Sequence, residues 1–564
     1  MGNTPRQGLA RAFELQKAGR LEEAEAGYAA YLAAFPDDLG ALNNAAVVAL
    51  QNGDLPLAVS RFRKLVALAP EQAHGHNNLG YALIHAGCPE DAIEQLDRAI
   101  ALDPHYATAH NNLGIAHERT DRRSEAIAAF ERALAIDPRY ADAAANLAEV
   151  LNGDDDTPRA RAAAKRALAA NPRHLGARVA LAVADALDGD LGGARETLET
   201  LAPTKPQFAG FWRVLGTLRF WGGDFEAAEA ASRCALTLDR NDRQAKFGVA
   251  AALLGSGDYR RGWRAFEERP DGVFGQSRRF RELPRWTGES LDGALLVICE
   301  QGLGDVVQFA RFASEARRRV AELVLLADGP WQTVAPLLAT VPGIDQVVTD
   351  GAALAALRAP PSAVASVLSL PFLLGIDTDS LPRALPYVSV LPDRAALWKP
   401  RLAAVERPRV GLAWAAHARR DVAYLTRQKT IPLPHLALLL ETPGVNFVSL
   451  QLGAAGELSP LGYLADRVTV FTRDIRDFGD TAAIMAELDL VISTDTSVAH
   501  VAGALGRPVW MIDRFNTCWR WRLASDRSPW YPTMRIFRQE RFGDWSGPLA
   551  RVATALADVS SVRA

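Results

Sequence analysis

A period of 34 residues runs through the first half of the chain. Self-similarity at a fixed period is the signature of a repeat architecture, in which one small unit is copied along the chain. The proline series is Pro36, Pro70, Pro104, Pro138, Pro172 and Pro206, and the glycine series is Gly19, Gly53, Gly87, Gly189, Gly223 and Gly257, with Asp121 and Asp155 in its two gaps. Two series of small residues follow the same interval. These registers predict eight repeats over roughly residues 5–276.

Each repeat is predicted to form two antiparallel helices. Small residues at matched positions, such as Gly80 and Ala92, allow the two helices to approach closely. Glycine or aspartate turns the chain between them, and proline ends the second helix. One pair cannot bury its own apolar face, so neighbouring pairs must stack into a superhelix. The pattern resembles the tetratricopeptide repeat, which implies a concave face that binds an extended peptide or a protein partner.

Asparagine occupies one repeat position in four successive units, at Asn44, Asn78, Asn112 and Asn146. A second asparagine precedes three of them. This resembles the asparagine ladder in the superhelix of O-GlcNAc transferases, and the resemblance implies that the four amides bind the backbone of an acceptor peptide. Asparagine is also common at this position of the tetratricopeptide consensus, so a purely structural role stays open.

The second half of the chain has a different pattern. Residues 269–293 are rich in glycine, proline and charge and are predicted to connect two regions. Short apolar runs then alternate with amphipathic segments, which predicts parallel α/β sheets. Residues 391–408 form a hinge candidate between two such series. The predicted architecture is a repeat superhelix over 1–276, a first Rossmann-like lobe over 277–395 and a second over 396–564.

Composition excludes several classes of protein. A net charge of −3 provides no general basic surface for nucleic acid. The four cysteines are far apart in sequence, which is typical of neither a metal site nor a disulfide scaffold. We find no secretory signal and no apolar span, and neither G-x-G-x-x-G nor a Walker A motif is present. A cytoplasmic protein with no bound cofactor or metal and no membrane span is therefore expected.

The first candidate for chemistry is "CEQGLGDVVQFAR", residues 299–311. A predicted strand ends here, Gly302 and Gly304 allow tight turning and close approach, and Asp305 follows at the start of a predicted helix. The carboxylate of Asp305 is expected either to cap that helix or to serve as a general base in a cleft.

The second candidate is "ISTDTSVAHVAGALGRPVWMI", residues 492–512. Asp495, Thr496, Ser497 and His500 occupy the turn between a predicted strand and a small-residue helix. These side chains could cap the helix, or they could hold an anionic ligand at its N-terminus.

Together the two motifs resemble those of the ADP-heptose lipopolysaccharide heptosyltransferases. "GLGDVVQFARF" is similar to the loop that carries their proposed catalytic base, and "DLVISTDTSVAHVAGALGRPVWMI" to their D-T-G-x-x-H-x-A donor segment. The resemblance is strongest to bacterial proteins that join tetratricopeptide repeats to such a domain, among them O-GlcNAc-transferase-like and flagellin-modifying enzymes. It implies a two-lobed GT-B glycosyltransferase.

The resemblance also implies roles for individual residues. Asp305 would be the base in an inverting transfer that needs no metal. The donor nucleotide sugar would contact Gly302, Gly304, Lys429, Asp495, Thr496, Ser497 and His500. Trp414, at the end of a predicted strand, is a further candidate for the cleft. A solvated loop lysine at Lys429 and a core-facing histidine at His500 stay open as alternatives. Ser497 replaces a glycine of the family motif, and "DRFNTCWRW" (513–521) replaces its Gly-Pro-Thr turn. ADP-heptose, a UDP-sugar and a CMP-nonulosonic acid therefore all remain open as donors. We favour core packing for the tryptophans and tyrosine of residues 510–545.

The sequence thus predicts a protein O-glycosyltransferase that modifies Ser or Thr of an acceptor bound by the repeats, with flagellin as one candidate. Two alternatives stay open. One is an adaptor or chaperone with a relic transferase domain. The other is a nucleotide-sugar epimerase or hydrolase, which would use the same two-lobed fold.

Overall fold

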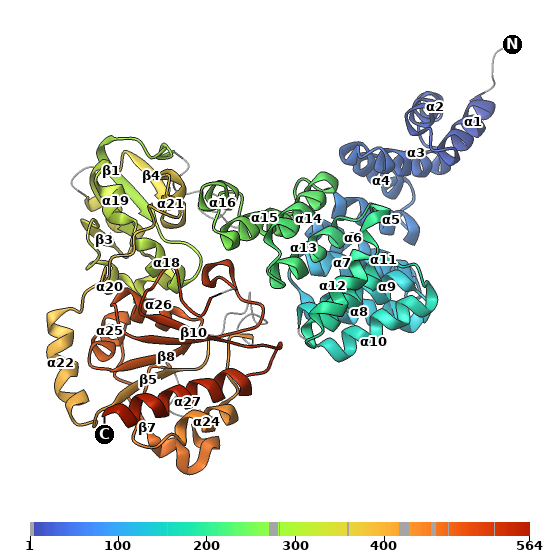
Figure 1. The fold of residues 1–564 in the computed structure, drawn as a ribbon. Coiled ribbons are helices and arrows are strands. Elements are labelled where there is room, and N and C mark those ends of the chain that lie inside the picture. Colours follow the sequence, from blue (N-terminus) through green and yellow to red (C-terminus); the bar gives the residue numbers. More distant parts are fainter. Residues whose placement is uncertain are drawn as a thin grey trace. The chain divides into compact units, whose positions relative to one another are not determined.

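The computed structural model (Figure 1) describes residues 5–154, 156–269, 280, 282–357, 360–416, 428–452, 458–471, 473–523 and 525–563. The chain divides into two compact units, Met1–Leu187 and Asp188–Ala564. The predicted boundary at 276/277 lies outside the described residues, whereas the one at 395/396 lies within helix α22 (Pro392–Ala403). None of the helices in the described parts of the chain is long and apolar enough to cross a membrane.

The first unit consists of helical pairs and one further helix (Figure 1). Its helices are α1 (Pro5–Lys17), α2 (Leu21–Ala34), α3 (Leu39–Gln51), α4 (Leu55–Leu68), α5 (Ala73–His85), α6 (Pro89–Leu102), α7 (Ala107–Arg119), α8 (Arg123–Ile136), α9 (Ala141–Gly153), α10 (Thr157–Ala170) and α11 (Leu175–Leu187). The turn between the helices of a pair needs a left-handed residue, and Gly53 (φ 77°) and Gly87 (φ 78°) supply it. Asp121 adopts the same conformation at φ 60°, so it takes the place of glycine, as predicted.

Close packing within a pair explains the small-residue series. A Cβ atom added to Gly114 would lie 2.6 Å from Cε1 of Phe130, which is fully buried on α8. A Cβ atom added to Gly80 would likewise lie 2.6 Å from Cγ of Leu96 on α6. A side chain at either glycine would push the two helices of its repeat apart.

The repeats continue at the start of the second unit. Its repeat helices are α12 (Leu191–Glu199), α13 (Ala209–Trp221), α14 (Phe225–Leu238), α15 (Arg243–Ser256) and α16 (Tyr259–Phe266). The α/β part that follows contains two sheets, and every strand pair within them is parallel. The fold class predicted from the sequence is therefore confirmed: helical repeats are followed by an α/β region.

The strand order of the first sheet is β3-β2-β1-β4 and that of the second is β10-β9-β8-β5-β6-β7. The strands are β1 (Leu291–Ile298), β2 (Val320–Leu326), β3 (Gln346–Val348), β4 (Ala363–Ser366), β5 (Arg409–Ala413), β6 (Asn446–Ser449), β7 (Val468–Val470), β8 (Leu490–Thr494), β9 (Val509–Asp513) and β10 (Met534–Arg538). The helices of this region are α18 (Leu303–Ala310), α19 (Ala313–Arg317), α20 (Ala335–Leu338), α21 (Leu370–Leu373), α22, α24 (Ala437–Leu440), α25 (Phe478–Ala486), α26 (Ser497–Ala504) and α27 (Ser546–Arg563). Central strands such as β1 and β8 are apolar and buried, as expected where helices cover both faces of a parallel sheet.

The hinge predicted at residues 391–408 is largely a helix. Most of the segment is α22, which contains Pro400 in its last turn. Trp398 and Leu402 on this helix are fully buried, and the indole N–H of Trp398 donates to a carboxylate oxygen of Asp480 at 2.9 Å. The prolines and charges indicated a hinge candidate; the segment forms a helix because one apolar face is buried against α25.

An aromatic cluster joins α16 to the α/β region. The Trp263 ring lies 5.8 Å from Phe309, 5.5 Å from Trp519 and 6.2 Å from Trp530. Trp519, Trp521, Trp530 and Tyr531 are at most 3% exposed, in agreement with the packing role favoured from the sequence. The cluster thereby fixes the segment around Trp519–Trp521, which carries a residue of the candidate site.

Candidate functional site

Both sequence motifs lie where the strand order of a sheet reverses. In the first sheet the chain moves from β1 through β2 to β3 and then returns to β4 on the other side of β1. In the second sheet it moves from β5 to β7 and returns to β8 beside β5. Ligands of open parallel sheets bind at such points, outside the carboxyl ends of the strands. The Asp305 loop follows β1, and Asp495 follows β8.

The two motifs contact each other although Asp305 and Asp495 are 190 residues apart (Figure 1). A Cβ atom added to Gly304 would lie 2.6 Å from Cδ2 of His500 and 3.3 Å from the Cα atom of Ser497. Gly304 is therefore required at the contact of α18 with α26. The sequence predicted that it allows tight turning and close approach; its backbone is not left-handed, so close approach is the physical reason for it.

Gly304→Ala is expected to disturb the site without unfolding the protein. The added methyl group would meet the imidazole ring of His500 and the backbone of α26, so α18 and α26 must separate, at a cost of about 1–3 kcal/mol. Denaturant unfolding measures this cost, and Gly192→Ala on α12 is a control, because its methyl group meets no neighbouring atom and its backbone is not left-handed. Unfolding free energies within about 0.5 kcal/mol of each other for wild type and Gly304→Ala would show that the contact is loose.

Asp305 lies in the first turn of α18 rather than at its N-cap, which is Gly302. Its Oδ2 atom accepts a hydrogen bond from the Gly302 N–H at 3.1 Å, and its Oδ1 atom lies 2.6 Å from Nη2 of Arg520. The preceding Gln301 is left-handed at φ 60°, a strained backbone conformation of the kind that often occurs at functional sites. With 23% of its side chain exposed, Asp305 is accessible to a ligand.

Asp495 and Lys429 form an ion pair in the second motif. Nζ of Lys429 lies 2.9 Å from Oδ2 of Asp495, and the aspartate side chain is only 7% exposed. Burial alone would raise the pKa of Asp495, but the charges of Lys429 and His500 outweigh burial and hold this pKa well below its usual range. Asp495 is therefore ionised at neutral pH and holds the Lys429 ammonium group at the end of β8.

His500 is buried on α26 between Asp495 and Tyr531. Its Nδ1 atom is 3.1 Å from the hydroxyl oxygen of Tyr531, and its Nε2 atom is 4.0 Å from Oδ1 of Asp495. Burial lowers the pKa of His500 to about 4, although the charges of Asp495 and Asp305 oppose this effect. The imidazole is therefore neutral at pH 7, where it donates or accepts hydrogen bonds but carries no charge.

The stability of the second unit is expected to fall as the pH falls from about 6.5 to 4. His500 binds its proton less readily in the folded state than in the unfolded chain, so protonation in this window favours unfolding by about 3 kcal/mol in total. The low pKa of Asp495 affects stability only at pH values below this range. Denaturant unfolding of wild type and His500→Gln at pH 7.0, 5.5 and 4.5 measures the contribution of His500. If both proteins lose stability in parallel, His500 does not titrate in this way.

The remaining predicted donor ligands take different positions. Thr496 is the N-cap of α26 and Ser497 its first residue; both are partly exposed at the helix N-terminus. Trp414 follows β5, and its side chain is 3% exposed within the core of the second sheet. Its carbonyl oxygen accepts the Ile431 N–H at 2.8 Å, which ties the segment that carries Lys429 to the strand end. Direct contact of the Trp414 indole with a donor stays a prediction.

The asparagines of the repeats form a continuous hydrogen-bonded ladder in the first unit. Asn78, Asn112 and Asn146 each donate to an asparagine of the preceding repeat, at distances of 3.0, 2.9 and 3.0 Å. Within a repeat, Asn77 donates to Asn78 at 3.2 Å. Each amide group carries two N–H donors, but Asn112 is only 5% exposed. Acceptor binding by Asn44, Asn78, Asn112 and Asn146 stays a prediction.

Two site residues, Arg520 and Tyr531, and a buried arginine near them, Arg311, were not predicted. Arg520 belongs to the segment that departs from the family motif. Its position between two tryptophans is the sequence feature that could have indicated a buried arginine. Tyr531 was grouped with packing aromatics, yet its hydroxyl contacts His500. Arg311, at the end of "GLGDVVQFAR", is 4% exposed and donates to the Trp530 carbonyl oxygen at 2.8 Å and to the Tyr387 hydroxyl at 3.2 Å.

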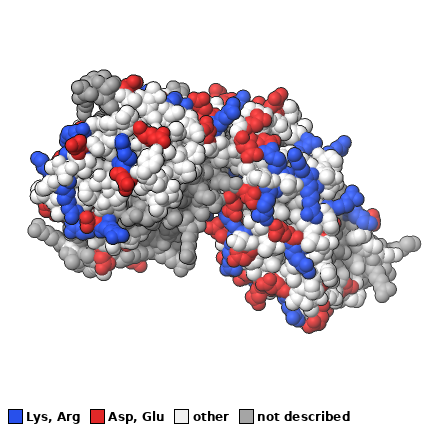
Figure 2. All heavy atoms as spheres, turned by 90° about the horizontal axis from the view of Figure 1, so that it is seen from below, with Lys and Arg blue, Asp and Glu red and all other residues white. Residues whose placement is uncertain are grey.

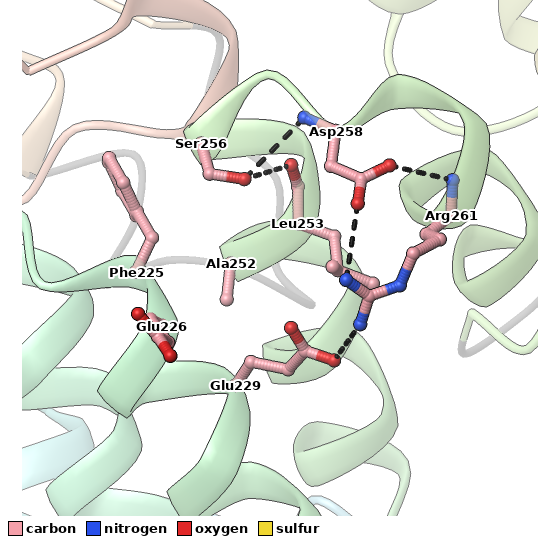
Figure 3. A pocket seen from close by; sticks show the side chains of 8 residues that line it. All are labelled: Phe225, Glu226, Glu229, Ala252, Leu253, Ser256, Asp258 and Arg261. Atoms are coloured by element: carbon pink, nitrogen blue, oxygen red, sulfur yellow. Dashed lines mark hydrogen bonds and ion pairs between the residues drawn. The ribbon is translucent and has the colours of Figure 1, made fainter.

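A separate groove lies among the last repeat helices (Figure 3). Its volume is about 340 Å³, and α14, α15 and α16 line it. Glu229 and Asp258 both face Arg261, at 2.6 and 3.2 Å, so the principal charges of the groove pair with each other (Figure 3). On the face shown in Figure 2, basic and acidic side chains of the described residues are interspersed.

Comparison with known proteins agrees with the repeat assignment. Tetratricopeptide-repeat family models match residues 9–73 and 48–87, 71–139 and 151–218. The N-terminal half of the chain is a tetratricopeptide-repeat region. Repeats of this kind point to a protein or peptide partner.

One relative extends beyond the repeats. Protein FlbA of Caulobacter vibrioides is 30% identical over 383 residues, which cover 63% of this chain and 62% of FlbA. The chain thus spans somewhat less than two thirds of the length of this relative. The aligned share is larger than the repeat region, so part of the α/β region is aligned as well.

Among solved structures, similar ones are repeat proteins that match part of this chain. MamA is 25% identical, covers 29% of this chain and 95% of its own, and has a TM-score of 0.27. TTC0263, a tetratricopeptide-repeat protein of Thermus thermophilus, is 26% identical, with coverage of 32% and 98% and a TM-score of 0.29. A tetratricopeptide-repeat protein of Parabacteroides merdae is 14% identical, with coverage of 45% and 100% and a TM-score of 0.39.

Proposed function

We propose that this chain is an inverting, metal-independent protein O-glycosyltransferase. It would move a sugar from a nucleotide-activated donor to Ser or Thr of a protein that the repeats bind, flagellin being one candidate. The observation that carries the proposal is the contact between the Asp305 loop, at the end of β1, and the Asp495–His500 segment, at the end of β8. A carboxylate from the region of one sheet meets, at two strand-order reversals, a turn of the other whose Asp495 holds the Lys429 ammonium group.

The roles follow from the charges that a sugar transfer creates. The acceptor hydroxyl oxygen forms the new bond to the anomeric carbon while the bond to the nucleotide phosphate breaks. Asp305 takes the hydroxyl proton, as a positioned base must in this step. Negative charge develops on the departing phosphate, where Lys429, the neutral His500 and the N-terminus of α26 stabilise it.

Binding of donor-type nucleotides tests the proposal directly. UDP, ADP and CMP, together with their sugar conjugates, are added to the whole chain, and thermal unfolding is followed. At least one nucleotide class is expected to raise the unfolding temperature, and Lys429→Met should remove this effect because it removes the positive charge at the end of β8. Lys399→Met, on the exposed side of α22, is the control and should respond like the wild type.

Transfer itself is tested in two steps. Proteins that co-purify with the chain are identified first, and the intact mass of each is then compared between cells with and without the gene. A mass increment of a sugar that depends on the gene supports transfer and identifies both sugar and acceptor. Consumption of the donor without any protein acceptor would instead indicate the epimerase or hydrolase alternative.

One observation favours the adaptor alternative. One oxygen of Asp305 is already engaged by Arg520 at 2.6 Å and the other by the Gly302 N–H at 3.1 Å, so neither is free for an acceptor hydroxyl group. A relic transferase domain that retained this ion pair would bind partners through the repeats alone. No response to any nucleotide in the thermal assay would support the adaptor.

A further inference from the structure

Arg520 links the two motifs of the candidate site. It lies on the short 3₁₀ turn Trp519–Trp521 of the second sheet region, yet its Nη2 atom pairs with Oδ1 of Asp305 beside the first sheet. Its Nε–H donates to the side-chain oxygen of Gln308 at 3.0 Å, and its guanidinium carbon lies 4.4 Å from the centre of the Trp519 ring. Only 12% of the side chain is exposed. These contacts fix the guanidinium group in a largely buried position, unlike that of a surface ion pair.

The charges around Arg520 come from both motifs. Burial would lower the pKa of Arg520, but the charges of Asp305 and Asp495 raise it. In turn, the charge of Arg520 lowers the pKa of His500. Among the described residues, Asp305 pairs with Arg520, and Asp495 pairs with Lys429. Within these two ion pairs the charges cancel without a ligand.

A bound phosphate would upset this balance. It adds negative charge next to two cations, and a guanidinium group matches the oxygens of a phosphate with parallel hydrogen bonds. Phosphate therefore competes with the Asp305 carboxylate for Arg520. If Arg520 turns to the phosphate, Oδ1 of Asp305 loses the guanidinium group that occupies it.

We propose that Arg520 is a ligand of the donor phosphate, and that its transfer from Asp305 to the phosphate frees Asp305 to act as the base. The proposal rests on the proposed glycosyl transfer and adds the order of events: the base becomes competent only after the donor has bound. It also removes the difficulty that the Asp305–Arg520 pair raises for catalysis. Oδ1 of Asp305, released by Arg520, then accepts the proton of the acceptor hydroxyl group.

A double-mutant cycle with inorganic pyrophosphate as the probe tests the proposal. Affinities are measured by calorimetry on the full chain for wild type, Asp305→Asn, Arg520→Gln and the double variant. Arg520→Gln should weaken pyrophosphate binding by about tenfold or more, because a charge-assisted contact is lost. Asp305→Asn should tighten it several-fold, because Arg520 no longer has to leave a carboxylate.

The double variant separates the specific mechanism from general electrostatics. If the tighter pyrophosphate binding of Asp305→Asn depends on Arg520, it should disappear when Arg520→Gln is also present. The cycle measures this coupling between the two residues. Arg535→Gln, which removes the same charge from β10, is the matched control and should bind like the wild type. Arg520→Lys, which keeps the charge but not the fork of donors, should bind with intermediate affinity.

The outcomes distinguish this proposal from the proposed function. If the wild type binds pyrophosphate and Asp305→Asn tightens binding equally with and without Arg520, the role of Arg520 is wrong while the nucleotide site survives. If neither pyrophosphate nor any donor-type nucleotide binds the wild type, the glycosyltransferase proposal falls and the Arg520 proposal falls with it. Circular dichroism of each variant shows that it is folded before its affinity is interpreted.

Discussion

Asp305→Asn is expected to lower the rate of sugar transfer by about a thousandfold while leaving donor binding intact or tighter. The asparagine has nearly the same shape, and its oxygen can still accept the Gly302 N–H, so the loop after β1 keeps its geometry. What is lost is a group that takes a proton, and a positioned base contributes about 10²–10⁴ to a rate. The loss of the charge also releases Arg520.

Single-turnover transfer with saturating donor and acceptor measures the effect of Asp305→Asn, because product release does not limit such a measurement. Asp292→Asn is the matched control, since Asp292 lies on the same strand β1 but at its opposite, exposed end. The control should transfer sugar at the wild-type rate. A rate for Asp305→Asn within about threefold of the wild type would show that another group accepts the proton.

Trp530→Ala is expected to destabilise the second unit by about 3–5 kcal/mol, as truncation of a large buried aromatic side chain does. Trp530 is fully buried, and its ring centre lies about 6 Å from those of Tyr259, Phe309 and Trp519. The substitution therefore opens a cavity at the point where α16, α18 and the Trp519–Trp521 turn meet. Because that turn carries Arg520, the site should loosen as well.

The unfolding of Trp530→Ala is best followed by denaturant titration. The chain contains two compact units, so the transition of the second unit must be separated from that of the first. Tyr463→Ala is the control: Tyr463 is 75% exposed, and its truncation should change the unfolding free energy by less than about 0.5 kcal/mol. A loss of less than about 1 kcal/mol for Trp530→Ala would mean that the cluster repacks around the gap.

The repeats could be predicted because every determinant of their fold is local. Helix pairing within one unit requires small residues such as Gly80 and Gly114 at matched positions, and the turn between helices requires glycine or Asp121. The residues that meet these requirements recur every 34 positions, so the same pattern is visible many times in the sequence. The α/β strands were equally visible as apolar runs, except for β10, whose sequence "MRIFR" alternates charged and apolar residues at the edge of its sheet.

The candidate site was predictable in its motifs but not in its contacts. The positions of Asp305 and His500 after apolar strands indicated a cleft, since carboxyl ends of parallel strands carry ligand sites. Arg520 and Tyr531 reach these two residues through side chains from a segment without regular periodicity. No spacing rule relates residues 305 and 520, because their proximity results from the packing of the aromatic cluster.

The sequence by itself therefore determined the repeat architecture, the two parallel sheets and the two motifs, because periodicity and residue type act over short distances along the chain. The tertiary structure alone decided that Gly304 is a contact point between α18 and α26, that the segment after β7 returns beside β5, and that each site carboxylate is paired with a cation. Charge balance is a property of distances in space, and those distances arise only when the sheets and the aromatic cluster have packed.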